Sequence, residues 1–98
     1  MPPSAAATAS RAERTCCVLD RLVPLMQTHG LPYGYSGFRW VWPPFSAVLR
    51  SDGANRLEIT VGSRELLIAE WQDAGVRVRH FARGDWDAGL LASLPPWA

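Results

Sequence analysis

The stretch that most constrains the fold covers residues 65–83, which read ELLIAEWQDAGVRVRHFAR. Two runs rich in apolar and β-branched residues flank the turn signal Gln-Asp-Ala-Gly, and this arrangement predicts a β-hairpin. A two-residue loop at Ala74 and Gly75 puts glycine where the turn needs a positive φ. The register that follows pairs Asp73 with Val76 and places three further pairs toward the core: Trp71 with Val78, Ala69 with His80, and Leu67 with Ala82.

The opposite face of this hairpin predicts a binding surface. In the same register it pairs Glu70 with Arg79 and Ile68 with Phe81, because side chains alternate between the two faces of a strand. An apolar centre with an arginine rim is typical of a protein interface rather than of a solvated face. The residues that we expect to contact a partner are Arg56, Leu66, Ile68, Arg77, Arg79, Phe81 and Arg83. The sequence leaves open whether the C-terminal helix covers this face instead.

Apolar segments before this hairpin predict the rest of the sheet. Residues 45–50 and 56–61 flank a five-residue loop and predict a second hairpin, with Leu49 opposite Leu57. Residues 38–42 predict a shorter strand, and because two prolines follow it we expect this strand either to lie at an edge or to bend sharply into the next one. The segment before that strand, LPYGYSG, predicts a loop.

Two helices are expected to accompany the sheet. Ser10 and Glu13 match a capping box, S-x-x-E, so a helix is expected to start there. Its apolar stripe is predicted to contain Ala12, Cys16, Leu19, Val23 and Met26, with Leu22 beside it. Pro24 lies inside this run, and a kink or a break is expected there. Asp85 is expected to cap a short second helix over residues 86–94.

Together these segments predict an α+β fold, with an N-terminal helix, an antiparallel meander of about five strands and a short C-terminal helix. Residues 1–9 are expected to form a disordered tail, because they are small, proline-rich and without periodicity. Residues 10–98 are expected to form a single α+β domain, since a chain of this length can bury one hydrophobic core.

Composition narrows the function classes. The formal net charge is +1, which disfavours binding to nucleic acid or membranes through bulk electrostatics. No apolar run approaches the roughly 20 residues that a membrane helix requires, and the N-terminal segment lacks the features of a signal peptide. We therefore expect a cytoplasmic protein that does not enter a membrane. The adjacent Cys16 and Cys17 are expected to be reduced, with Cys16 buried.

The sequence predicts no enzyme. Ser36 lies in a GYSG segment that lacks the glycine spacing and the context of a nucleophile elbow, so a turn is expected. His29 and His80 are the side chains that titrate near neutral pH, and we expect His80 to be a satisfied core residue. Adjacent cysteines lack the C-x₂-C spacing of zinc sites. We therefore expect no catalytic site, no metal ion and no cofactor.

Two hypotheses about function follow. The first is a non-enzymatic protein-binding module of the adaptor, inhibitor, immunity or chaperone type, whose partner is another protein or a second copy of the chain. The alternative is a single-stranded nucleic-acid-binding protein whose sheet aromatics stack on bases, which needs Phe81, Trp40 or Trp42 exposed beside the arginines. A second candidate surface is aromatic, because tryptophan and tyrosine are frequent in binding hot spots. It contains Tyr33, Tyr35, Trp40 and Trp42.

Overall fold

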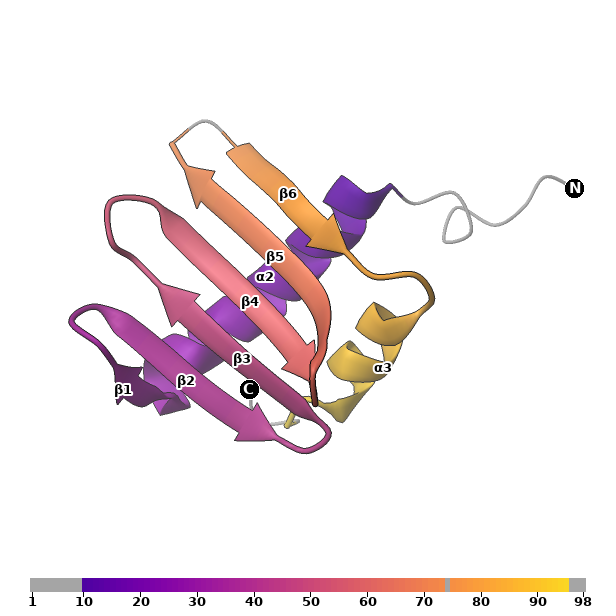
Figure 1. Ribbon diagram of the computed structural model, residues 1–98, viewed down its shortest axis with the longest axis horizontal. Helices are drawn as coiled ribbons and strands as arrows, with labels where there is room; N and C mark the ends of the chain where they lie inside the picture. The colour runs from indigo at the N-terminus through magenta and orange to yellow at the C-terminus, as the bar shows by residue number, and fades with distance from the viewer. Residues whose placement is uncertain (1–9, 74, 96–98) are drawn as a thin grey trace, which may run out of the picture.

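The computed structural model describes residues 10–73 and 75–95 and shows an α+β fold (Figure 1). Helix α2 (Arg11–His29) leads into a six-stranded antiparallel sheet, and the short helix α3 (Trp86–Ser93) follows it. The strands are β1 (Leu31–Tyr33), β2 (Gly37–Trp42), β3 (Phe45–Arg50), β4 (Asn55–Val61), β5 (Arg64–Gln72) and β6 (Gly75–Phe81). They are ordered β1-β2-β3-β4-β5-β6, so each strand pairs with its neighbour along the chain.

The predicted fold class is confirmed, with one strand more than expected. The additional strand is β1, which lies in the segment predicted to be a loop and pairs antiparallel with β2. Because β1 begins opposite Arg39, the residues from Trp40 to the end of β2 have no strand partner on that side, whereas Phe38 and Arg39 are paired with β1 and the predicted edge position is wrong for them. The predicted disordered tail, residues 1–9, lies outside the described residues.

Both helices lie on one side of the sheet (Figure 1). Helix α2 crosses the sheet diagonally and contacts both β6 and β2, and α3 packs against α2 beside the lower end of the sheet. We call the side that carries the helices the inner face and the other side the outer face. The core lies between the sheet and the helices, where Leu22, Met26, Leu57, Ile59 and Leu90 are fully buried.

The capping box at the start of α2 is confirmed, because Ser10 Oγ accepts a hydrogen bond from Glu13 N and the Glu13 side chain accepts one from Ser10 N. The helix continues through Pro24 without a break. Its buried stripe is rotated from the predicted one and consists of Thr15, Val18, Leu19, Leu22, Leu25 and Met26. The Thr15 hydroxyl donates to the Arg11 carbonyl oxygen at 2.7 Å, so a polar residue is buried there with its hydrogen bond satisfied.

The rotation of this stripe corrects the prediction for the cysteines. Cys16 was expected in the core, but the thiols of Cys16 and Cys17 are both exposed and free. Because Thr15 occupies the buried position, its neighbour Cys16 is turned about 100° further around the helix and reaches solvent.

The centre of the sheet has the predicted register. Leu49 pairs with Leu57 in the β3–β4 hairpin, and Leu57 pairs with Ala69 between β4 and β5. All three side chains are buried on the inner face. The alternation of apolar and polar residues therefore fixes the pairing here, because a slip of one residue would expose the core.

The predicted register of the β5–β6 hairpin is wrong. Trp71 pairs with Val76 rather than with Val78, because Gln72 and Gly75 already face each other across the turn. The pairing then shifts between Ile68 and Ala69, which leaves Arg79 as an extra residue in β6. This β-bulge reverses the alternation beyond it.

The bulge at Arg79 decides where two predicted site residues lie. Phe81 pairs with Leu67 and is 6% exposed, so it belongs to the core and not to the outer face. His80 pairs with Ile68 and is exposed on the outer face, so its expected place in the core is also wrong. The tilted contact between the rings of Phe81 and Trp86 ties β6 to the start of α3.

A second bulge lies in β5 and moves a third predicted residue. Between the pairs Ile59–Leu67 and Thr60–Glu65, Leu66 is the extra residue. Leu66 is 2% exposed, and its carbonyl oxygen accepts a hydrogen bond from Ala82 N at 2.8 Å. The prediction that Leu66 lies on the outer face is therefore wrong, because the bulge allows two successive leucines of β5 to be buried.

The start of α3 also differs from the prediction. Asp85 occupies the cap position but makes no side-chain hydrogen bond to the helix. The neighbouring Asp87, in the first turn, instead forms an ion pair with Arg14 of α2. Helix α3 is thus held by the core residues Leu90 and Leu94 and by this ion pair.

Candidate protein-binding face

The outer face carries rows of side chains that run across the strands. One row contains Arg50, Arg56, Glu70 and Arg77, each paired with the next. The adjacent row contains Arg39, Val48, Glu58, Ile68 and His80, again each paired with the next. Neither described helix covers these rows, because both lie on the inner side (Figure 1). The sequence left open whether the C-terminal helix covers the outer face. Helix α3 does not cover it.

The apolar centre of the outer face is smaller than predicted. Val48 and Ile68 are both half-buried there, on either side of Glu58. Leu66 and Phe81, which were expected to enlarge this centre, are in the core. The face is therefore a charged surface with two apolar side chains in its middle.

A chain of ion pairs crosses the middle of the outer face. Arg56 lies 3.5 Å from Glu58 and 3.6 Å from Glu70, measured between nitrogen and carboxylate oxygen. Glu70 in turn lies 3.4 Å from Arg79. These side chains are between 28% and 51% exposed, so the pairs are solvent-screened and contribute little stability. Their main effect is to hold the guanidinium groups in place.

Other arginines around this network have no acidic partner. Among the described residues, Arg39, Arg77 and Arg83 form no ion pair, and all three are exposed. Arg50 instead lies with its guanidinium carbon 5.5 Å from the centre of the Tyr33 ring, a cation–π contact. The face thus offers positively charged groups that its own carboxylates do not neutralise.

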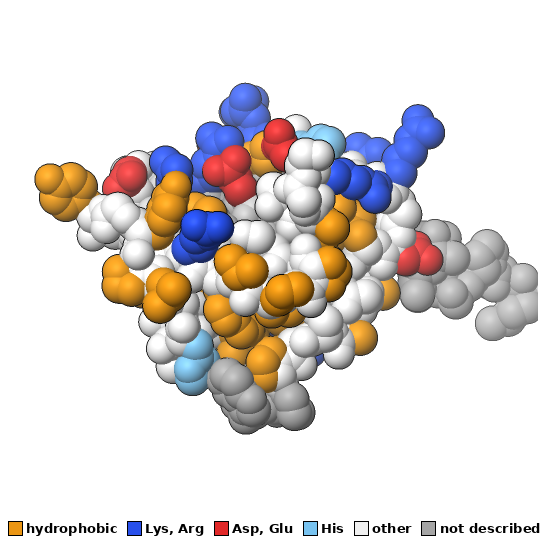
Figure 2. Space-filling model, turned by 60° about the horizontal axis from the view of Figure 1, so that its bottom comes forward, with side chains coloured by type: hydrophobic (Ala, Val, Ile, Leu, Met, Phe, Trp, Pro, Cys, Tyr) orange, Lys and Arg blue, Asp and Glu red, His pale blue; other side chains and the backbone are white. Residues whose placement is uncertain are grey.

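The outer face carries more positive than negative side chains. The strand registers place five arginines there, Arg39, Arg50, Arg56, Arg77 and Arg79, against the three glutamates Glu58, Glu65 and Glu70, an excess of two positive charges. The whole chain has a net charge of +1, so the other charged residues sum to −1. In Figure 2 the arginine side chains gather along the upper side of the molecule, while hydrophobic side chains occupy the side toward the viewer.

The four residues of the predicted aromatic surface are not brought together. Trp40 pairs with the buried Ala47, so Trp40 and Trp42 lie on the inner face, where their rings stack at 4.8 Å. Trp42 Nε1 also donates a hydrogen bond to Ser93 Oγ of α3 at 3.0 Å. Tyr33 and Tyr35 lie at the other end of β2 and are exposed. Trp40 and Trp42 therefore pack between the sheet and the helices, and they do not border the arginine rows.

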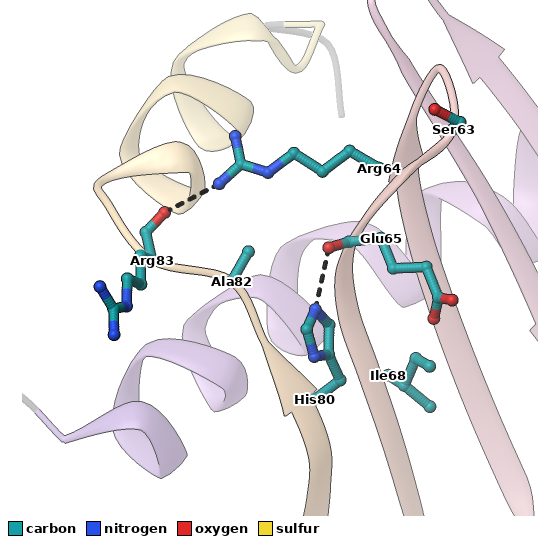
Figure 3. A pocket seen from close by; sticks show the side chains of 7 residues that line it. All are labelled: Ser63, Arg64, Glu65, Ile68, His80, Ala82 and Arg83. Carbon is teal, nitrogen blue, oxygen red and sulfur yellow. Dashed lines mark hydrogen bonds between the residues drawn. The ribbon is translucent and has the colours of Figure 1, made fainter.

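A shallow hollow of about 610 Å³ opens at the lower end of β5 and β6 (Figure 3). Arg64, His80 and Arg83 surround it, and Ile68 and Ala82 provide its apolar lining. Sequence reasoning missed this hollow because the bulge at Arg79 turns His80 outward. The break in alternation was visible, since apolar residues stand at positions 76 and 78 and then at 81 and 82.

The residues considered for catalysis or metal binding remain apart. In the described part of the chain, no three histidine, cysteine or acidic side chains gather in a way that would hold a metal ion. Ser36 Oγ donates a hydrogen bond to Asp52 Oδ1 at 2.6 Å across two exposed turns. No helix within the described residues is long and apolar enough to cross a membrane.

Comparison with protein-family models, with curated proteins and with solved structures gives no match to this chain.

Proposed function

We propose that the chain is a protein-binding module whose outer face docks an acidic surface of another protein. The observation that carries this proposal is the sheet face that neither described helix covers, with its excess of two positive charges. Arg77 and Arg83 would pair with carboxylates of the partner, since a guanidinium presents a planar set of donors that matches a carboxylate. Val48 and Ile68 would supply the desolvated centre of the contact.

Two features favour a protein partner over single-stranded nucleic acid. Sequence-tolerant binding of single strands uses aromatic rings that stack on bases beside the basic groups. The sheet tryptophans are instead on the inner face and Phe81 is buried, so the arginine rows offer the Tyr33 ring beside Arg50 rather than a series of rings. In addition, Glu58 and Glu70 lie among the arginines and would repel a phosphate backbone.

Electrostatic complementarity of this kind mainly governs specificity and the rate of association. The half-buried Val48 and Ile68 give a small desolvated area, which suits a partner that is bound reversibly rather than a permanent subunit. We therefore expect binding that weakens as the salt concentration is raised, because the exposed guanidinium groups become screened.

The test is recovery of partners by the tagged chain from cells that naturally express it, quantified by mass spectrometry. The double variant Arg77→Glu, Arg79→Glu reverses the charge of the outer face and is expected to lose the specific partner at least tenfold. The control is Arg21→Glu, which makes the same chemical change at an exposed position of α2 on the other side of the molecule. Equal recovery of every partner by the wild type and the double variant would contradict the proposal.

A further inference from the structure

We propose that the hollow at the lower end of β5 and β6 binds one carboxylate of the protein partner, and so acts as the anchor point of the docked surface. This inference rests on the proposed function. It adds the chemical class of the group that is recognised, a carboxylate on an acidic side chain, and the place where it enters, at the lower end of β5 and β6 where the outer face borders the inner one.

Arg64 supplies the main binding group. One of its Nη atoms donates a hydrogen bond to the Arg83 carbonyl oxygen at 3.2 Å, which holds the guanidinium across the mouth of the hollow (Figure 3). Among the described residues Arg64 forms no ion pair, so its remaining N–H groups lack a carboxylate partner. A guanidinium that is already oriented loses less conformational entropy when it binds.

His80 fixes a second side of the hollow. Its Nε2 lies 2.9 Å from the Glu65 carbonyl oxygen, and because a carbonyl only accepts, Nε2 carries the hydrogen atom. This contact sets the ring orientation beside Ile68 and Ala82, which give the hollow its apolar lining. The side chain of Glu65 extends from the opposite side of its strand from Arg64 (Figure 3), so its carboxylate does not occupy the position that we assign to the partner.

The two bulges build this hollow. The bulge at Arg79 turns His80 toward the outer face. The bulge at Leu66 places that side chain in the core, while the adjacent Glu65 stays exposed. A regular ladder would place Leu66 and Phe81 on the outer face, where they would fill this region with apolar side chains. Bulges are frequent next to functional sites because they redirect individual side chains.

The charge around the hollow selects the ligand. Of the charged residues that line the hollow, Arg64 and Arg83 are positive and Glu65 is negative, an excess of one positive charge, and the Arg83 side chain has no acidic partner in the described chain. The apolar lining by Ile68 and Ala82 suits the methylene groups of a glutamate or aspartate side chain better than a fully hydrated phosphate. The geometry therefore favours a carboxylate on a short aliphatic stem.

The experiment is a titration of the ¹⁵N-labelled full chain with the blocked peptide acetyl-(Glu)₆-amide at low salt, followed by NMR. We expect the Nε–Hε signals of Arg64 and Arg83 and the ring signals of His80 to shift first. Arg64→Gln should weaken binding of this peptide at least fivefold. Arg21→Gln on α2 is the matched control, and it should change binding less than twofold.

Arg64→Gln is suitable because the Arg64 side chain makes one exposed hydrogen bond, so its removal should leave the fold intact. Thermal unfolding and the unchanged signals of core residues such as Leu57 would verify this. The conservative variant Arg64→Lys keeps the charge and loses the planar fork, so it should restore only part of the affinity.

Three results would overturn the inference. Equal affinity of Arg64→Gln and the wild type, with shifts centred on Arg77 and Arg79, would remove the hollow as the anchor and leave the proposed function standing. Tighter binding of the oligonucleotide dT₆ than of the peptide at the same sites would show a phosphate site instead. Absence of any binding of the peptide at millimolar concentration would also reject it, while the proposed function would still be judged by partner recovery.

Discussion

The guanidinium of Arg14 on α2 is bound to the carboxylate of Asp87 on α3 by two hydrogen bonds. Arg14 Nε donates to Asp87 Oδ2 at 2.9 Å, and Nη2 donates to the other carboxylate oxygen and to the Gly84 carbonyl oxygen. The same guanidinium lies 4.7 Å from the centre of the Phe81 ring. One side chain thus joins the two helices to the end of the last strand.

The first prediction concerns the pH dependence of stability. The Arg14 hydrogen bond, together with the attraction between the two charges, holds the pKa of the Asp87 carboxyl below its ordinary value of 3.8, although burial opposes this shift. Because the folded-state pKa is the lower one, the ion pair stabilises the protein fully above about pH 3.8 and this stability is lost as the pH falls through the folded-state pKa. We expect Asp87→Asn to cost about 1–2 kcal/mol at pH 7.

Urea denaturation of the wild type and of Asp87→Asn at a series of pH values measures this effect. The difference in the free energy of unfolding should shrink below pH 3.8, because the amide does not titrate and the wild-type ion pair is being protonated. Asp20→Asn, at an exposed site of α2, is the control and should change little. A difference that stays constant from pH 7 to pH 2 would contradict this account.

Replacement of glycine by alanine is expected to change the stability in opposite directions at Gly37 and Gly89. A Cβ at Gly37 would contact the Tyr33 carbonyl oxygen and lie 2.8 Å from the Leu49 carbonyl oxygen, both backbone atoms of neighbouring strands. Gly37→Ala is therefore expected to cost about 1–3 kcal/mol through overpacking. A Cβ at Gly89 in α3 meets no heavy atom within 4 Å, so Gly89→Ala should stabilise the helix by about 0.5–1 kcal/mol. Thermal unfolding of both variants tests these signs.

The placement of Phe81 predicts a stability effect rather than a binding effect. Phe81 is 6% exposed and contacts the rings of Trp86 and the guanidinium of Arg14, so Phe81→Ala should cost about 3–5 kcal/mol. Ile68→Ala, at the half-buried outer position, should cost clearly less. Chemical denaturation would contradict the register of β6 if the two variants were destabilised equally.

The exposure of the two cysteines can be tested by their reactivity toward a thiol reagent. Cys16 and Cys17 are exposed free thiols on α2, so both should react with a thiol reagent in the native protein. Mass spectrometry after a short treatment with iodoacetamide should show two modifications without denaturant. Modification of a single cysteine, with the second reacting only after unfolding, would contradict the observed rotation of the helix.

The sequence specified those parts of the fold in which local and long-range signals agree. The capping box at Ser10 follows from the S-x-x-E spacing before an apolar run, and the pairing of Leu49 with Leu57 follows from strand residues whose burial alternates regularly. The outward position of Arg77 follows for the same reason, because its neighbours Val76 and Val78 are half-buried on the inner face.

The errors in the site come from two inserted residues. A bulge is a single extra residue in a strand, and although the change in apolar alternation after position 78 indicates a break, it does not identify Arg79 as the inserted residue. The bulge at Arg79 inverts the faces beyond it, so Phe81 was assigned to the wrong side even though the two strands of the hairpin were predicted. The buried stripe of α2 was predicted wrongly for a different reason. Thr15 is polar and was not assigned to the core, but its hydroxyl donates a hydrogen bond to the Arg11 carbonyl oxygen and can therefore be buried.

The most direct test of the outer face as a docking surface is site-specific photo-crosslinking in cells that naturally express the chain. A photoreactive phenylalanine analogue at Ile68 lies in the middle of the outer face, and the same analogue at the exposed Gln27 of α2 reports on the opposite side. We predict a discrete protein adduct from position 68, lost when Arg77→Glu and Arg79→Glu are added, and no such adduct from position 27. An identical adduct pattern from both positions, or an adduct from position 68 that survives the charge reversal, would contradict the account.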